Sequence, residues 1–173
     1  MRWMWIDRIV ELVPKERMVA IKHISLAEEH LHDHFPSTPT RRAMPVMPMS
    51  LIVEGMAQTA GVLVGHAEGF KEKVVLAKVS KAKIDRDATP GCTLRYTATI
   101  EQFTAAGAST KGIVELIEPS AVGEGKAEVI GQIDLIFSHL DQNMGGVEYP
   151  EENFVFSESF KTLMETSGIE ANF

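Results

Sequence analysis

One apolar segment, Met44–Gly65, constrains the fold most, because it contains a single charged residue, Glu54. Two prolines precede the helical part of this segment, and Ser50 is a suitable N-cap, so the sequence predicts a helix from about Ser50 to His66. Apolar side chains occur on every side of that helix, which is typical of a helix enclosed by its own domain. We therefore expect a chain built around one central helix, with its glycines packed closely against other backbone.

Glu54 has two interpretations. A lone carboxylate on a buried helix costs several kcal/mol unless it is paired, hydrated or neutralised. It is either half of an internal salt bridge, or an acid or base facing a pocket, where desolvation favours its neutral form. Gln58 lies four residues further on and therefore shares its face of the helix. The two polar residues, with prolines and glycines, interrupt the apolar run, so we reject a membrane span.

Composition limits the remaining possibilities. A chain of 173 residues fits one domain with an appendage. Its one cysteine, Cys92, excludes an internal disulfide and a thiolate metal cluster. The first residues are interrupted by charges and do not resemble a signal peptide, so a cytoplasmic protein is expected. The net charge of −7 argues against nucleic-acid binding.

The negative charge is concentrated at the end of the chain. Residues 141–173 contain seven acids and one base, which accounts for −6 of the −7. We therefore divide the chain into a domain over residues 1–140 and an acidic extension over residues 141–173. The extension is expected to be a partly ordered tail. As an alternative, its apolar residues pack on the body or on a neighbouring subunit; these are Phe154, Phe156, Phe160 and Leu163.

Alternating and β-branched residues after the helix predict a series of strands. The expected strands are residues 18–24, 74–84, 93–103, 109–117 and 126–138. Residues 7–17 are interpreted as a lead-in with a turn, and Ser37–Met47 as an irregular loop before the helix. A helix followed by a meander of strands indicates an α+β fold, with a mostly antiparallel sheet and the helix on one face.

Four segments resemble a known family. In collinear order they read DRIVELVPKERMVAIKHIS, HFP, PVMPMSLIVEGMAQTAGVL and LAKVSKAKIDRDATPGCTLRYTATI. Over roughly residues 6–140 they are similar to the 3-hydroxyacyl-[acyl-carrier-protein] dehydratases of the FabZ/FabA type. The resemblance implies the hotdog fold, in which a sheet wraps a long central helix. It also implies dehydration of 3-hydroxyacyl thioesters on acyl carrier protein to trans-2-enoyl thioesters, in fatty-acid biosynthesis, without metal or organic cofactor.

The resemblance also implies the site. His34 would be the general base and Glu54 the general acid, each site taking one residue from each chain of a homodimer. A trimer of dimers would be the larger assembly. Gln58 would be a polar neighbour, and Met49 and Ser50, at the helix start, would contact the substrate. The chemistry suits the pair, because the reaction removes a proton next to the carbonyl and delivers one to the departing hydroxyl.

The chain departs from the family pattern in three places. His34 and Glu54 are twenty positions apart, about six more than the family pattern, and we place the extra residues near Thr40–Pro45. Met49 follows Pro48, where the family has a glycine whose N–H serves the oxyanion. Asp33 and Ser37 replace the glycines on either side of His-Phe-Pro. We expect the inserted loop to reshape the pocket and change substrate preference rather than reaction type.

Two further groups of residues have alternative interpretations. The cations have two interpretations: a solvated surface, or a docking site for an acidic carrier protein and the phosphate of its phosphopantetheine-linked acyl chain. They are Lys78, Lys81, Lys83, Arg86, Arg41 and Arg42. On a strand, His30, His32 and His34 could align for a metal, but without a fourth ligand at a recognisable spacing we favour a polar loop.

Three alternatives to the dehydratase stay open at this point. They are a dehydratase/isomerase of the same fold, a thioesterase of the same fold, and a non-catalytic hotdog subunit that partners an active paralogue.

Overall fold

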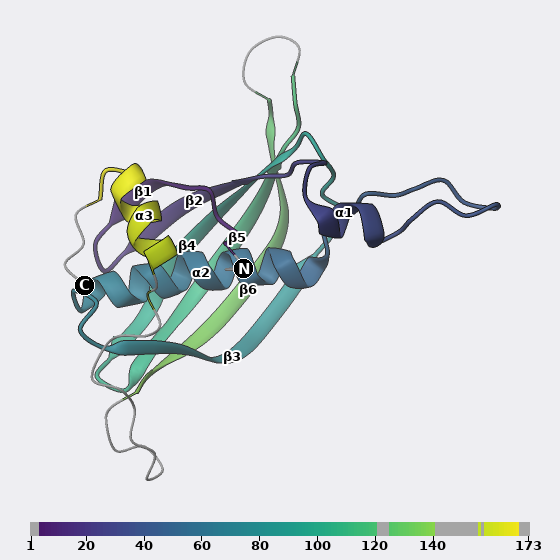
Figure 1. The fold of residues 1–173 in the computed structure, drawn as a ribbon. Coiled ribbons are helices and arrows are strands. Elements are labelled where there is room, and N and C mark those ends of the chain that lie inside the picture. Colours follow the sequence, from purple (N-terminus) through teal and green to yellow (C-terminus); the bar gives the residue numbers. More distant parts are fainter. Residues whose placement is uncertain (1–3, 121–124, 141–155, 157, 170–173) are drawn as a thin grey trace.

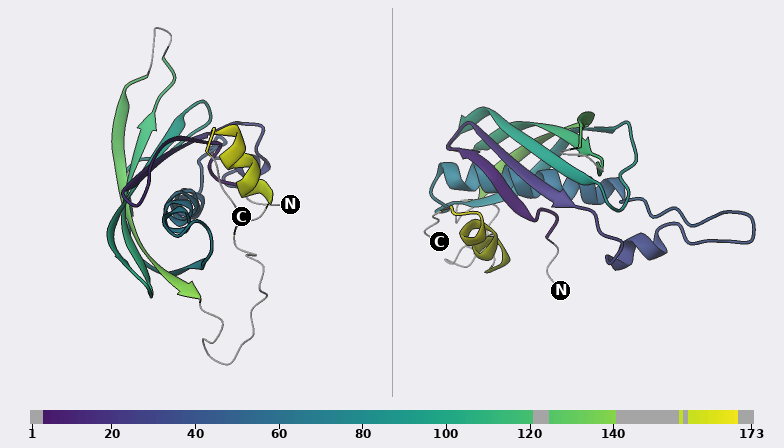
Figure 2. Two further views of the ribbon diagram at one scale, coloured as in Figure 1. Left: turned by 90° about the vertical axis from the view of Figure 1, so that its left-hand side faces the viewer. Right: turned by 90° about the horizontal axis from the view of Figure 1, so that it is seen from above.

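The computed structural model describes residues 4–120, 125–140, 156 and 158–169. In these ranges six strands form one antiparallel sheet in the order β1-β2-β4-β5-β6-β3. The strands are β1 Arg8–Val13, β2 Arg17–His23, β3 Lys73–Ile84, β4 Thr93–Thr104, β5 Gly107–Ile117 and β6 Ala127–Leu140. The helices are α1 Glu29–Asp33, α2 Met49–Ala67 and α3 Glu158–Thr166. The sheet curves around α2, which runs along its concave face (Figures 1 and 2).

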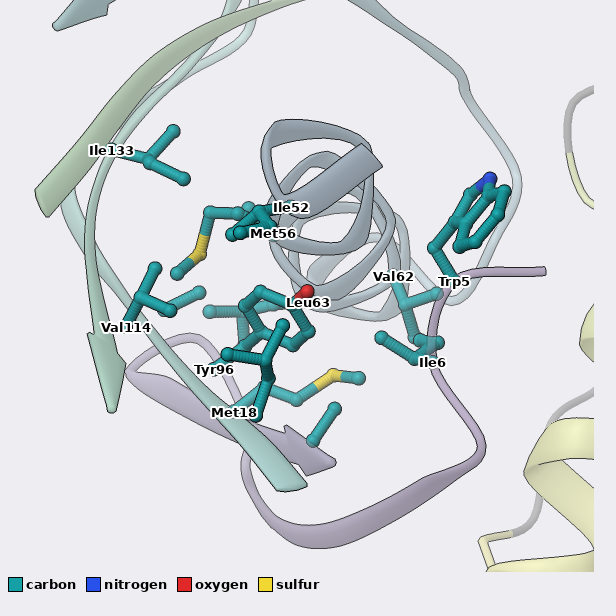
Figure 3. Packing of buried hydrophobic residues seen from close by; sticks show 14 of the residues in the cluster. Trp5, Ile6, Met18, Ile52, Met56, Val62, Leu63, Tyr96, Val114 and Ile133 are labelled. Atoms are coloured by element: carbon teal, nitrogen blue, oxygen red, sulfur yellow. The ribbon is translucent and has the colours of Figure 1, made fainter. Parts of the chain in front are cut away.

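The alternation in the strands builds the core against α2. In β4, Leu94, Tyr96 and Ala98 are fully buried, whereas Arg95 and Thr97 between them are half-buried on the other face. The register pairs Tyr96 with Val114 of β5, so both side chains point the same way. Figure 3 shows Tyr96, Val114 and Ile133 gathered around Met56 of the helix. The predicted α+β class, with an antiparallel sheet and a helix packed on it, is confirmed.

Two local elements were missed in the sequence. Residues 8–13 form β1, paired with β2, where a lead-in was expected. Its sequence does not alternate between apolar and polar residues, since Ile9 and Val10 are both apolar although Ile9 is buried and Val10 is 50% exposed. The short helix α1 contains His30 and His32, for which a polar loop was favoured. With five residues it is too short to produce a helical period.

The start of α2 differs from the prediction. The helix begins at Met49, and Pro48 is its N-cap without a side-chain cap hydrogen bond. The Pro48 carbonyl accepts the N–H groups of Leu51 at 2.9 Å and Ile52 at 3.3 Å. The prediction of Ser50 as N-cap is therefore wrong. Proline has a fixed φ, here −55°, and orients the chain for the first turn without a capping side chain.

The glycines of α2 pack against aromatic rings rather than against backbone, which corrects the expectation. A Cβ at Gly55 would lie 2.6 Å from the Tyr96 ring, and one at Gly65 would lie 2.4 Å from the Phe156 ring. Each glycine makes room for a buried aromatic side chain.

One stripe of α2 is not covered by this chain, so the expectation of a helix enclosed on every side is wrong there. Glu54 is exposed, and Val53, Ala57 and Gly61 are only half-buried. These positions recur at helical spacing and form one face. Figure 3 shows the sheet, with Val114 and Ile133, on one side of the helix and the N-terminal segment, with Trp5, on another. No helix among the described residues has both the length and the hydrophobicity of a membrane span.

The described part of the C-terminal segment packs onto the body. Phe156, Leu163 and Met164 are buried, and α3 lies against β1 (Figure 2). The Ile9 N–H donates to Ser167 Oγ at 3.0 Å, which fixes the end of α3 to the sheet edge. The alternative interpretation, packing on the body, is therefore confirmed for Phe156 and Leu163, while Phe154 lies outside the described residues. The division into residues 1–140 and 141–173 stays a prediction.

Candidate active site

His34 is positioned by the end of α1. Its backbone N–H donates to the His30 carbonyl at 3.1 Å, and its half-buried ring stacks on Phe35 with centroids 4.2 Å apart. The ring Nδ1 lies 2.7 Å from the Val46 carbonyl oxygen. A carbonyl can only accept, so Nδ1 carries a hydrogen, and in the neutral ring the lone pair is on Nε2. The imidazole is thus held in the tautomer that a general base requires.

His34 and the beginning of α2 border the same cavity. It has a volume of about 310 Å³, and its lining includes His34, Phe35, Val46, Met49 and Arg86. The first N–H groups of a helix lack partners within it and form the positive end of its dipole. The structure therefore brings together a base and a helix N-terminus suited to negative charge. The Met49 side chain is 48% exposed, and Ser50 does not border this cavity.

Glu54 and Gln58 border a second cavity of about 290 Å³, which is otherwise apolar. Gln58 Nε2 donates to Glu54 Oε1 at 3.0 Å, and the Trp5 N–H donates to Gln58 Oε1 at 2.8 Å. Because a backbone N–H can only donate, it fixes which end of the Gln58 amide faces Glu54. Among the described residues Glu54 has no ion pair. The internal salt bridge is therefore wrong, and the expected burial is not provided by one chain.

The two predicted catalytic residues border different cavities. The lining of the His34 cavity does not include Glu54, and the lining of the Glu54 cavity does not include His34. The two cavities lie beside α2. The His34 cavity is at the N-terminal end of the helix, and the Glu54 cavity is along the stripe that this chain leaves uncovered.

The neighbouring histidines point in different directions. The His30 ring packs edge-on against Trp5, with centroids 5.1 Å apart, and burial lowers its pKa. The His32 Nε2 bonds to the Leu26 carbonyl at 2.6 Å, and the His34 Nδ1 bonds to Val46. Among the described residues no group of three histidine, cysteine or acidic side chains is placed to hold a metal ion.

The predicted carrier-docking cations occupy two regions. Lys78, Lys81 and Lys83 lie on the exposed edge strand β3. Lys81 Nζ donates to Gln132 Oε1 at 2.6 Å, and Lys83 Nζ lies 2.9 Å from Asp85.

The arginines lie nearer to His34. Arg86 borders the His34 cavity and forms ion pairs with Glu118 and Glu128. Arg41 lies over the Phe35 ring, 5.3 Å from its centroid. Arg42 is exposed beside it.

The inserted loop forms an arm. The Thr38 and Arg41 backbones bond to each other at 2.8 and 3.3 Å, and the Met44 N–H donates to the Phe35 carbonyl at 3.0 Å. The arm projects from the body beyond α1 (Figures 1 and 2). Within one chain, residues 37–45 line neither the His34 cavity nor the Glu54 cavity. Its predicted effect on the pocket stays a prediction.

Comparisons with known proteins agree with this architecture. A model of the FabA-like domain matches residues 2–126. The chain belongs to the FabA-like family of 3-hydroxyacyl-[acyl-carrier-protein] dehydratases. A FabZ dehydratase from Streptococcus pyogenes serotype M3 is 35% identical over 129 residues, which cover 74% of this chain and 83% of that protein. One from Acidiphilium cryptum is 45% identical over 93 residues, which cover 52% of this chain and about half, 53%, of that protein.

A solved structure supports the fold. The dehydratase heterocomplex ApeI:P from Xenorhabdus doucetiae aligns with a TM-score of 0.56 at 14% identity, covering 80% of this chain and 84% of that chain. The hotdog fold implied by the sequence is confirmed.

Several contacts of the site had no signal in the sequence. Trp5 holds Gln58 through its backbone N–H, and Val46 holds His34 through its carbonyl. Backbone groups are common to every residue, so no residue type marks these positions. Phe156 and Phe160 also border the Glu54 cavity, from a segment that was interpreted as a tail.

Proposed function

We propose that this protein dehydrates 3-hydroxyacyl thioesters carried on acyl carrier protein to trans-2-enoyl thioesters, as a cytoplasmic enzyme of fatty-acid biosynthesis. The observation that carries the proposal is the His34 ring, fixed by the Val46 carbonyl with its Nε2 free, beside the start of α2. Membership of the dehydratase family supports it.

In this proposal His34 Nε2 removes a proton from C2 of the substrate. The electron pair of the C2–H bond becomes the C2=C3 double bond, and the C3–O bond breaks. The negative charge that develops on the thioester oxygen is stabilised by N–H groups at the start of α2, including that of Met49. The side chain of Met49 does not remove this donor, since the backbone N–H is present in every residue except proline.

Glu54 supplies the proton with which the hydroxyl leaves as water. Its Oε1 already accepts a hydrogen bond from Gln58, so we assign the transferable proton to Oε2. The Trp5 N–H keeps Gln58 in the donating orientation. Gln58 is thus a positioning residue for Glu54. Transfer of a proton from His34 back to Glu54 restores both groups.

A homodimer would complete the site. Glu54 is exposed in one chain, and a carboxyl that holds a proton near neutral pH needs desolvation. A second chain over the Val53–Gly61 stripe would supply that desolvation and bring its own His34 to Glu54. The edge strand β3 supports this assembly, because it has a neighbouring strand on one side only and carries Leu76 and Val79, which are 42% and 41% exposed. The unpaired backbone groups of an edge strand can pair with another strand. A trimer of dimers is the larger assembly that we expect.

The carrier would approach the His34 cavity. Arg86 borders that cavity, and Arg41 lies over Phe35, which also borders it. These cations, with Arg42, suit the phosphate of phosphopantetheine and an acidic carrier surface. Lys78, Lys81 and Lys83 lie on β3, where the dimer would form, and we expect a smaller part in docking for them.

The test is hydration of a trans-2-enoyl thioester, followed by loss of its absorbance. His34→Ala and Glu54→Gln should each lower kcat by about 100-fold or more, with the fold retained. The matched controls are His32→Ala, an exposed neighbour, and Glu101→Gln, an exposed carboxylate on β4; both should keep wild-type turnover. Wild-type rates in either site variant would refute the assigned roles. Release of free thiol instead of hydration would indicate a thioesterase, and inactivity of the wild type would favour a non-catalytic subunit.

A further inference from the structure

The Glu54 cavity has one polar end and an apolar remainder. Glu54 and Gln58 are its polar residues, and the rest of its lining consists of alanine, glycine, valine, leucine and phenylalanine side chains. At 1.5 Å per residue, the α2 positions that border it, from Glu54 to Val62, extend over about 12 Å. Its volume of about 290 Å³ is at the small end of ligand pockets.

The far part of this cavity is bordered by the C-terminal segment. Phe156 and Phe160 border it together with Val62 of α2 and Phe137 of β6. The match to the FabA-like domain ends at residue 126, so these two phenylalanines come from outside the matched region. Phe160 is half-buried, which leaves part of its ring free to face a ligand.

The phenylalanines are held in place by several independent contacts. The Phe156 ring meets Phe70 edge-on at 4.9 Å and Phe160 at 5.9 Å between centroids. It also fills the space that a side chain at Gly65 would need. Leu163 is 5% exposed, so α3 itself is anchored. Rings fixed in this way can act as a rigid wall.

We propose that Phe156 and Phe160 form the end wall of the acyl-chain site and set the longest chain that the enzyme accepts. This inference rests on the proposed function, which places C3 of the substrate beside Glu54. From that point the alkyl tail needs an apolar path, and the cavity along α2 provides one. The tail therefore runs toward Phe160, and a chain that reaches the ring before C3 reaches Glu54 is excluded.

The test compares the dependence of kcat/KM on chain length in three variants. The substrates are trans-2-enoyl thioesters of four to fourteen carbons. Each is assayed with the wild type, Phe160→Ala, Phe160→Trp and the control Phe103→Ala. Phe103 is a half-buried phenylalanine of β4 that does not line the Glu54 cavity. Phe160→Ala should raise the ratio of long-chain to short-chain kcat/KM by about tenfold, and Phe160→Trp should lower it by a similar factor. Phe103→Ala should leave the ratio unchanged.

The outcomes separate the two proposals. An active Phe160→Ala enzyme with the wild-type ratio overturns the end wall and leaves the dehydratase intact. A wild type that hydrates no thioester overturns the proposed function. In that case the end-wall proposal is tested by measuring the affinities of S-alkyl pantetheine thioethers by calorimetry, because these compounds cannot react. Loss of affinity for the longer thioethers alone in Phe160→Trp supports the wall, and equal affinities in Phe160→Trp and wild type refute it.

Discussion

Gly55→Ala gives a direct test of how the central helix packs. Alanine would favour the helix by roughly 1 kcal/mol over glycine. Its Cβ, however, would lie 2.6 Å from Tyr96 Cζ and Oη and 2.8 Å from Cε2, and Tyr96 is fully buried. Relieving such overpacking costs about 1–3 kcal/mol. The packing cost exceeds the propensity gain, so we expect Gly55→Ala to lower the free energy of unfolding by roughly 1 kcal/mol.

In a protein that already carries Tyr96→Leu, we expect Gly55→Ala to have the opposite effect on stability. Tyr96→Leu removes the ring atoms that the new Cβ would meet. It also removes a buried hydroxyl that has no hydrogen-bond partner among the described residues. In that background the propensity gain remains and the clash does not, so Gly55→Ala should stabilise by up to about 1 kcal/mol. The effect of Gly55→Ala on the free energy of unfolding differs between the two backgrounds by the coupling energy of residues 55 and 96.

The assay is urea unfolding of the four proteins of this cycle, extrapolated linearly to water. Protein concentration is kept equal, because an oligomer's stability depends on it. The same effect of Gly55→Ala in both backgrounds, or a gain in stability in the wild-type background, would refute the packing argument.

Three further predictions concern deletion of the arm, docking of the carrier protein and the dependence of stability on pH. Deleting Thr40–Pro45 should leave a folded protein but move its chain-length profile on small thioesters, because the arm starts and ends beside the His34 cavity; an unchanged profile contradicts this. Reversing Arg41 and Arg42 to Glu should raise KM for a carrier-bound substrate more than for a small thioester, with the difference shrinking in high salt; equal effects would argue against docking. Burial lowers the pKa of His66 from 6.5, so the unfolded chain binds the proton more tightly. The free energy of unfolding should therefore fall as pH drops below about 6.5, and His66→Gln should reduce that slope in urea titrations. The same slope in both proteins would refute a contribution from His66.

The sequence by itself determined the elements whose residues carry a local period. The alternation around Leu94 and Tyr96 predicted β4 to within a residue at its end, and the apolar run predicted α2. His34 and Glu54 could be named as candidates because their motifs are short and contiguous. β1 was missed because its burial depends on the neighbours that cover an edge strand, which no local pattern records.

The tertiary structure alone decided which distant residues meet. It placed Trp5 on Gln58 and Phe156 on Gly65, and it distributed His34 and Glu54 between two cavities. It also left one stripe of α2 uncovered. Such contacts join residues far apart in the chain, and they depend on the curvature of the sheet around the helix. A local pattern determines which face of a strand or helix is apolar, whereas the partner of that face is settled only when the whole sheet closes on the core.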